Sequence, residues 1–133
     1  MAIFAVARLT ADADLTLTFS SDEDVTADGY AIAFEAEAAD GSGALTLTAS
    51  RAAGTITVGI WDPVLKRVQF TVRVPQATVK AAVVDYLTGR RARPNEALEL
   101  LFSVQITHPT GEVQATHAEP MYLEPGVMPA STT

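Results

Sequence analysis

The 133-residue sequence contains no cysteine, which removes three kinds of chemistry. A disulfide framework, a thiol nucleophile and a thiolate metal site all require that residue. Long apolar runs are also missing, since no segment approaches the ~20 apolar residues needed to span a bilayer. The apolar start MAIFAVARL has no basic segment before it and is too short for a secretory signal. We therefore expect a soluble, unprocessed protein with no membrane partner.

Positive charge is scarce, with 9 Lys and Arg residues against 16 Asp and Glu residues and a net charge of −7. This balance argues against a nucleic-acid partner, because neutralising phosphates requires clustered basic side chains. The charge is also uneven. Residues 11–40 have no Lys or Arg and hold Asp12, Asp14, Asp22, Glu23, Asp24, Asp28, Glu35, Glu37 and Asp40, whereas Arg90, Arg91 and Arg93 form one basic cluster. Such asymmetry suits contacts between subunits, although a solvated surface has the same pattern.

Residues that carry catalytic or metal chemistry are few. The two histidines, His108 and His117, flank an expected hairpin loop, and no serine stands in a Gly-x-Ser-x-Gly context. The acidic segment from Asp22 to Asp28 lacks the ligand order of an EF-hand, so a solvated loop is favoured over a calcium site. We expect a protein that is not an enzyme, with no catalytic residues, cofactor, metal or small-molecule substrate.

The dominant positive feature is period-2 alternation of apolar and polar residues, typical of half-buried antiparallel strands. The segment DLTLTFS shows it, with Leu15, Leu17 and Phe19 on one face and hydroxyl side chains on the other. The alternating segments are residues 14–20, 29–38, 44–50, 56–60, 68–74, 97–107 and 113–118, with residues 121–123 as a further candidate. About seven short strands separated by turn residues predict an all-β antiparallel sandwich.

The segment GTITVGIWDPVLKRVQFTVRVP predicts a core hairpin. Its first arm places Ile56, Val58 and Ile60 on one face, and its second arm places Val68 and the following alternate residues there. The connector from residue 62 to residue 66 offers few polar groups for a binding pocket. Trp61, the only tryptophan, is out of phase with the inward series, so it either covers the sandwich edge or contacts a partner.

One segment follows helical spacing instead. In PQATVKAAVVDYLTG, apolar residues recur at three- and four-residue intervals between Pro75 and Gly89, which predicts a helix over about residues 76–87. A pair of short strands is the competing interpretation. We expect residues 1–124 to form one domain, and residues 125–133, with two prolines and no periodicity, to form a flexible tail.

Three stretches carry a resemblance to a known family: GYAIAFEAEAADGSGALTLTAS, then GTITVGIWDPVLKRVQFTVRVPQAT, then ELLFSVQITHPTGEVQATHAEPMYLEPGV. In this order they resemble the immunoglobulin-like module at the N-terminus of the baseplate upper proteins of tailed bacteriophages. The resemblance covers most of residues 14–124 and consists of strand alternation and turns.

The resemblance implies a virion component that docks through its β-sandwich into a baseplate, tail or head–tail assembly. Its partners would be other phage structural proteins, it would work as a homo-oligomer or ring component, and it would be assembled in the bacterial cytoplasm. Trp61, Arg90, Arg91 and Arg93 are the candidate interface residues. A ligand- or carbohydrate-binding sandwich is the alternative, although 7% aromatic residues is poor material for a sugar-stacking face.

Overall fold

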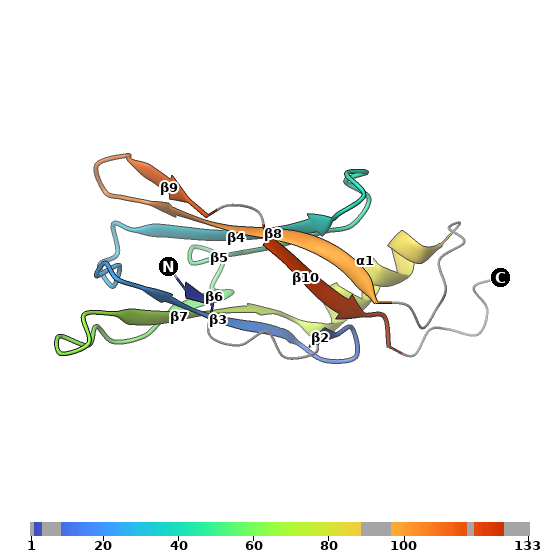
Figure 1. Cartoon of the computed structure of the whole chain (residues 1–133), viewed down its shortest axis with the longest axis horizontal. Helices are drawn as coiled ribbons and strands as arrows, with labels where there is room; N and C mark the ends of the chain where they lie inside the picture. Colours follow the sequence, from blue (N-terminus) through green and yellow to red (C-terminus); the bar gives the residue numbers. More distant parts are fainter. Residues whose placement is uncertain (1, 4–8, 89–96, 117–118, 127–133) are drawn as a thin grey trace.

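The computed structural model describes residues 2–3, 9–88, 97–116 and 119–126 (Figure 1). In this part of the chain the structure is mostly β with one short helix, which confirms the all-β prediction. The elements are β1 (Ala2–Ile3), β2 (Leu9–Thr10), β3 (Leu15–Ser21), β4 (Ala31–Ala38), β5 (Thr46–Ser50), β6 (Ile56–Val58), β7 (Val68–Val74), α1 (Gln76–Leu87), β8 (Leu98–Thr107), β9 (Val113–Ala115) and β10 (Glu119–Glu124).

The strands form two sheets. The four-stranded sheet has the order β1-β3-β7-β6, and all of its pairs are antiparallel. Within it, β3 pairs with β7 over its whole length, from Leu15 opposite Val74 to Ser21 opposite Val68. The predicted hairpin is formed by β6 and β7, but β6 ends at Val58, two residues earlier than the sequence indicated.

The six-stranded sheet has the order β2-β10-β8-β4-β5, with β9 also paired to β8. On one side, β8 pairs with β4 from Ala31 opposite Thr107 to Ala38 opposite Leu100. On its other side, β9 and β10 pair with successive parts of β8. The expected strand over residues 113–118 is therefore the shorter β9, with β10 following it. The parallel pairing of β2 with β10 had no counterpart in the sequence prediction.

The two sheets lie in two layers, and their apolar faces meet between them (Figure 1). Phe19 of β3 marks the centre: its ring lies 5.4 Å from that of Phe70 in its own sheet. It also lies 6.4 Å from Phe34 and 6.0 Å from Phe102, both in the opposite sheet. Burying each such side chain stabilises the fold by about 1.5–3 kcal/mol, so the alternation read from the sequence builds one continuous core.

The helix α1 follows β7 directly and buries Val79 and Val83, as its spacing predicted. Its first N–H groups need acceptors, because no residue i−4 precedes them in the helix. Asp14, in the connection before β3, supplies one: its Oδ1 accepts from the Gln76 backbone N–H at 2.7 Å. Its Oδ2 accepts from Arg73 Nε at 2.9 Å and Nη2 at 2.6 Å. These bonds, those from Arg73 first, lower the pKa of the Asp14 carboxyl below its ordinary value.

A second polar contact holds the other side of α1. Lys80 Nζ donates to Asp12 Oδ1 at 2.6 Å and to the Pro125 carbonyl at 3.1 Å. The sequence predicted that Pro125 begins a flexible tail. In the structure Pro125 is buried, and its carbonyl accepts a hydrogen bond from Lys80 of the helix. The rest of the expected tail, residues 127–133, lies outside the described residues. No helix in the described part of the chain is both long enough and apolar enough to cross a membrane.

The molecule has two different ends. The connections β3–β4 (residues 22–30), β6–β7 (residues 59–67) and β8–β9 (residues 108–112) lie together at the left of Figure 1, as the strand registers require. We call this the loop end. The helix α1, the β2–β3 connection and the β4–β5 turn lie at the opposite end, which we call the helix end.

Candidate functional site

The β6–β7 connection is a well-defined turn. Asp62 closes it by accepting the backbone N–H groups of Val64 and Leu65 on Oδ1, at 2.9 and 3.1 Å. Asp62 also forms an antiparallel bridge with Arg67, through backbone bonds of 2.8 and 3.3 Å. The chain reverses through Lys66, which adopts a left-handed φ of 52°. An aspartate that bonds to the backbone two residues on favours such turns, so the local sequence fixes this shape.

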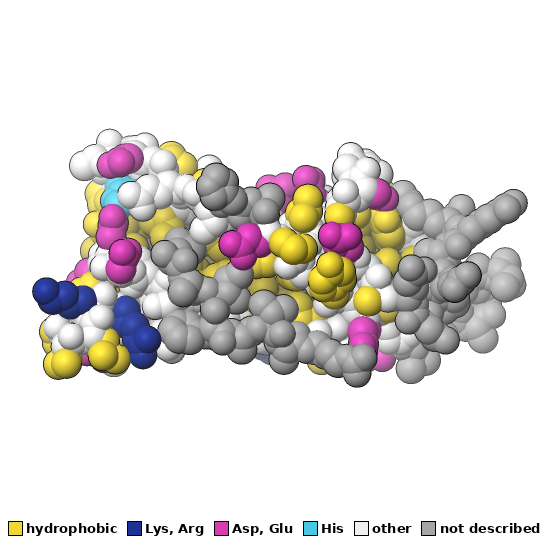
Figure 2. All heavy atoms as spheres, viewed as in Figure 1, with side chains coloured by type: hydrophobic (Ala, Val, Ile, Leu, Met, Phe, Trp, Pro, Cys, Tyr) yellow, Lys and Arg dark blue, Asp and Glu magenta, His cyan; other side chains and the backbone are white. Residues whose placement is uncertain are grey.

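This turn exposes apolar side chains. Ile60, Val64 and Leu65 are 92, 86 and 58% exposed. Lys66 beside them is exposed as well, and Figure 2 shows hydrophobic and basic side chains gathered at the left end of the molecule. We call Ile60, Val64, Leu65 and Lys66 the tip surface. Apolar residues concentrated at one projecting turn are typical of contact sites for other molecules.

The prediction that Ile60 points into the core is wrong. The alternation Ile56, Val58, Ile60 looks continuous in the sequence, but the last ladder pair is Val58 opposite Phe70. Gly59 then donates its N–H to the Gln69 carbonyl at 2.8 Å, and the chain enters the turn. Once pairing stops, the two-residue period no longer determines which face a side chain occupies.

Trp61 is half-buried and packs against the edge of the core. It therefore covers the end of the two-layered body, one of the two roles expected of it, and contact with a partner stays a prediction. The other candidate interface residues, Arg90, Arg91 and Arg93, lie outside the described residues. The sequence analysis missed the remaining tip residues, because Val64 and Leu65 stand in a short connector without any periodic pattern.

Arg51 organises the loop end, and the sequence carried no sign of this role. Its guanidinium donates to four backbone carbonyls of the β3–β4 connection: from Nη1 to Val25, Ala27 and Tyr30 at 2.9, 2.8 and 3.2 Å, and from Nη2 to Thr26 at 2.8 Å. The Asp28 carboxylate lies 3.9 Å from Nη2. A planar, always-charged donor fork suits several carbonyls at once, so Arg51 fixes the course of the whole connection.

The β3–β4 and β8–β9 connections pack against each other. A Cβ added to Gly29 would stand 2.9 Å from Pro109 Cγ, so a glycine is required there for the close approach. The ring of His108 lies 5.1 Å from that of Tyr30, and its Nε2 lies 3.4 Å from the Glu23 carboxylate. Ser21 Oγ donates to the Glu23 carbonyl at 3.1 Å and accepts from the Glu23 backbone N–H at 3.2 Å, so this serine bonds to the backbone beside the histidine. His117 lies outside the described residues.

The carboxylates of the acidic segment turn to separate partners. Asp24 accepts from the Thr26 hydroxyl and backbone N–H, and these bonds lower the pKa of its carboxyl. Glu23 faces His108, and Asp28 faces Arg51. Among the described residues, no three metal-ligating side chains converge on one point.

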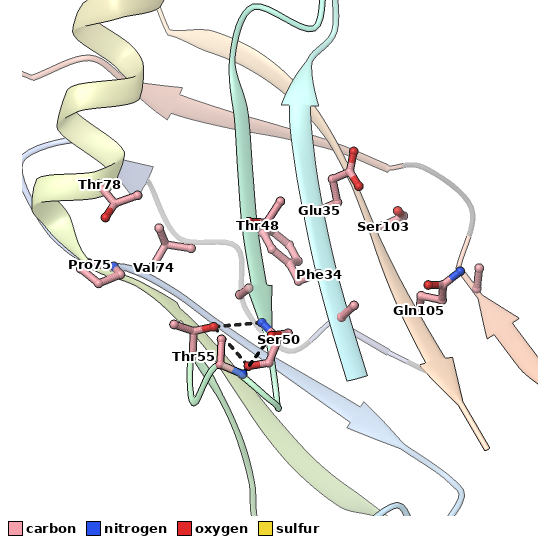
Figure 3. Close-up of a pocket in the computed structure, with 14 residues that line it drawn as sticks. Phe34, Glu35, Thr48, Ser50, Thr55, Val74, Pro75, Thr78, Ser103 and Gln105 are labelled. Carbon is pink, nitrogen blue, oxygen red and sulfur yellow. Dashed lines mark hydrogen bonds between the residues drawn. The ribbon is translucent and has the colours of Figure 1, made fainter. Parts of the chain in front are cut away.

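A hollow of about 590 Å³ lies at the edge of β5, where the outer face of the six-stranded sheet meets the core-facing Phe34 of the same sheet and Val74 of the other sheet (Figure 3). Its polar lining includes Glu35, Thr48, Ser103 and Gln105, and Pro75 and Thr78 border it from the start of α1. Ser50 and Thr55 are joined by bonds of 2.9 to 3.2 Å at its rim. Among the described lining residues Glu35 is the one ionisable group, so these residues offer hydrogen bonds without an acid–base pair.

No protein-family model matches the chain, and no curated protein matches it.

Proposed function

We propose that this chain is a non-enzymatic structural or adaptor protein of a tailed-phage or prophage particle, which docks through an immunoglobulin-like β-sandwich into a baseplate, tail or head–tail assembly. The observation that carries the assembly role is the tip surface, where Ile60 and Val64 are 92 and 86% exposed. A hairpin fixed by Asp62 presents these side chains without a large loss of conformational entropy on binding. The assignment to a phage particle rests on the sequence resemblance.

The strand order supports the immunoglobulin-like assignment. Taking β1, β3, β7 and β6 as strands A, B, E and D reproduces one sheet of that fold in order. The other sheet then has β9 and β10 as G, β8 as F and β4 as C, with β5 as the added C′ strand. In this assignment the β3–β4 and β8–β9 connections are the B–C and F–G loops, which serve recognition in variable domains. Binding by analogy of fold alone is weak support, so the exposed tip remains the main argument.

The test is incorporation into particles. Particles induced from the strain that encodes the chain are purified by density gradient, and the chain is quantified by mass spectrometry. We expect it at a fixed ratio to the major tail or baseplate proteins. A variant in which Ile60, Val64 and Leu65 are all serine is expected to fold and to be absent from the particles. Wild-type chain that is abundant in the lysate but missing from purified particles contradicts the proposal.

The hollow at the edge of β5 favours a second candidate function, binding of a small polar ligand such as an oligosaccharide. Glu35 and Gln105 offer polar side chains on adjacent strands there. The test is a heteronuclear NMR titration of the chain with oligosaccharides, in which shifts confined to β4, β5 and β8 and abolished by Gln105→Ala support this function. An unchanged spectrum at millimolar oligosaccharide contradicts it.

A further inference from the structure

The chain carries a second exposed apolar patch, on the outer face of β8 and β10. Leu100, Phe102, Met121 and Leu123 point into the core, so the residues between them point outward. Pro120 pairs with Leu101, and Tyr122, 56% exposed, pairs with Glu99. On the other side of Leu101, the paired residue is Glu37 of β4. We call Glu37, Glu99, Leu101, Pro120 and Tyr122 the sheet-face surface.

Figure 2 shows hydrophobic side chains bordered by acidic ones in the middle of this face, over β8 and β10. A large exposed aromatic such as Tyr122 is the residue type that dominates protein interfaces. Apolar groups at the centre and charges at the border are the usual composition of such a site. Because the bordering side chains Glu37 and Glu99 are negatively charged, a partner that projects both apolar and basic side chains fits this surface best.

The tip surface has that composition. Its apolar members are Ile60, Val64 and Leu65, and Lys66 adds a positive charge next to them. Other cations of the described residues have partners inside the molecule: Arg51 bonds to loop carbonyls, Arg73 to Asp14 and Lys80 to Asp12. In a chain of net charge −7, Lys66 is thus presented on the turn that also exposes Ile60, Val64 and Leu65.

We infer that the tip surface of one copy docks on the sheet-face surface of a second copy. This inference rests on the proposed assembly function and names the partner as another molecule of the same chain. The aliphatic tip would cover Leu101, Pro120 and Tyr122, and Lys66 would face Glu99 and Glu37. Apolar contact supplies the affinity, and the opposite charges fix the orientation.

The tip and the sheet face belong to different sheets, with the tip at the loop end and the face on the side of the molecule. The contact is therefore head-to-tail and leaves one tip and one face open in each dimer. Such contacts repeat into rings where the rotation closes and into filaments where it does not. A tip of four residues covers a small area, so each single contact is weak and assembly depends on protein concentration.

The experiment measures self-association of the purified chain by sedimentation velocity, from micromolar to millimolar concentration. The variants are Lys66→Glu on the tip and Glu99→Lys on the sheet face, with Asp85→Lys on the exposed side of α1 as the matched charge reversal. We expect each of the first two variants to weaken association about tenfold or more, because like charges meet. The double variant K66E/E99K should restore self-association, because opposite charges meet again. Asp85→Lys should leave self-association unchanged.

Mixing the two single variants separates this arrangement from a symmetric dimer. The basic tip of the E99K chain fits the acidic face of the K66E chain, and the acidic tip of the K66E chain fits the basic face of the E99K chain. The mixture should therefore associate beyond dimers, whereas a symmetric contact would stop at a 1:1 dimer. A wild-type chain that stays monomeric at all concentrations overturns the inference. So does self-association that Lys66→Glu and Glu99→Lys leave unchanged. If the chain is monomeric yet the triple-serine tip variant is lost from particles, the proposed function stands and the self-docking is wrong.

Discussion

The two ends of this molecule treat their charged and apolar residues in opposite ways. At the helix end, Asp12, Asp14, Arg73 and Lys80 bond to each other or to backbone groups around α1. At the loop end, Arg51 donates hydrogen bonds to the β3–β4 connection. The neighbouring β6–β7 turn exposes three aliphatic side chains. Charged side chains that bond within the molecule hold it rigid. Apolar side chains that remain exposed to solvent are available to a partner. The difference assigns contact to the exposed turn of the loop end, whereas ion pairs stabilise the helix end and Arg51 stabilises the connection beside that turn.

We expect the largest effect on stability from replacing Arg51, whose hydrogen bonds hold the β3–β4 connection. Arg51→Ala removes the donors of four carbonyls and should lower the free energy of unfolding by about 2–4 kcal/mol, because part-buried acceptors lose charged donors. Urea denaturation measures it. Arg51→Lys is the matched control: it keeps the charge but cannot reach all four carbonyls, and should lose most of the same energy. A change below 0.5 kcal/mol would show that the connection holds its course without Arg51.

The same substitution at the two ends should give different results. Val79→Ala removes methyl groups from a fully buried position under α1 and should cost about 2 kcal/mol. Val64→Ala, at a position that is 86% exposed, should change the free energy of unfolding by less than about 0.5 kcal/mol. Thermal and urea unfolding of both variants check this. Equal losses would mean that the tip is packed in solution and would remove it as a contact surface.

Acid should weaken the helix end through Asp14. The pKa of Asp14 is lowered in the folded chain, from an ordinary value of 3.8, chiefly by its bonds with Arg73. A lowered pKa contributes stability above the pKa of the unfolded carboxyl, and that contribution is lost as pH falls through the folded value. Asp14→Asn should therefore lower the melting temperature by a few degrees at neutral pH. The difference from wild type should shrink below about pH 4.

For Asp14→Asn the informative control is Asp22→Asn, an exposed carboxylate of the acidic segment. It should leave the melting temperature at neutral pH unchanged, because its side chain is exposed. A wild-type minus Asp14→Asn difference that stays constant from neutral pH to pH 2 would contradict the assignment of this carboxylate to the helix start.

The smallest effect is expected at the turn itself. Lys66 adopts a left-handed backbone conformation that costs a non-glycine residue about 1 kcal/mol. Lys66→Gly relieves that cost but adds freedom to the unfolded chain, so a net gain of at most about 0.5 kcal/mol is expected. The same variant should weaken self-association, since the charge is lost. A clear loss of stability instead would mean that the Lys66 side chain contributes to holding the turn.

Sequence periodicity was sufficient for the parts of the fold that alternate over five or more residues. The strands β3, β4, β7 and β8 and the helix α1 were predicted because their buried side chains recur with the spacing of a strand or a helix. Pairing between distant segments was not predictable in the same way. The parallel contact of β2 with β10 depends on two residues whose pattern is too short to read.

The sequence analysis named Trp61, which lies next to the tip surface, as a contact candidate but none of the four tip residues, and the structure makes the reason clear. Ile60 continues an apolar alternation and so was assigned to the core, but pairing had already ended at Val58. Arg51 stands in a turn after β5, and its carbonyl partners lie 21 to 26 residues earlier. No local pattern marks a side chain whose role depends on contacts that form only in the folded chain. Exposed and structural residues in turns look alike in the sequence.

The reach of Arg51 has a consequence for the order of events in folding. Because Arg51 directly follows β5, we expect it to reach the carbonyls of the β3–β4 connection only after β5 has paired with β4. The β4–β5 hairpin closes over a short turn and can form early, whereas the connection before β4 is fixed only afterwards. The amides of residues 22–30 should therefore gain protection from hydrogen exchange later than those of β4 and β5. A chain still being synthesised or folding would present an incomplete loop end, and the assembly proposed above would require finished molecules.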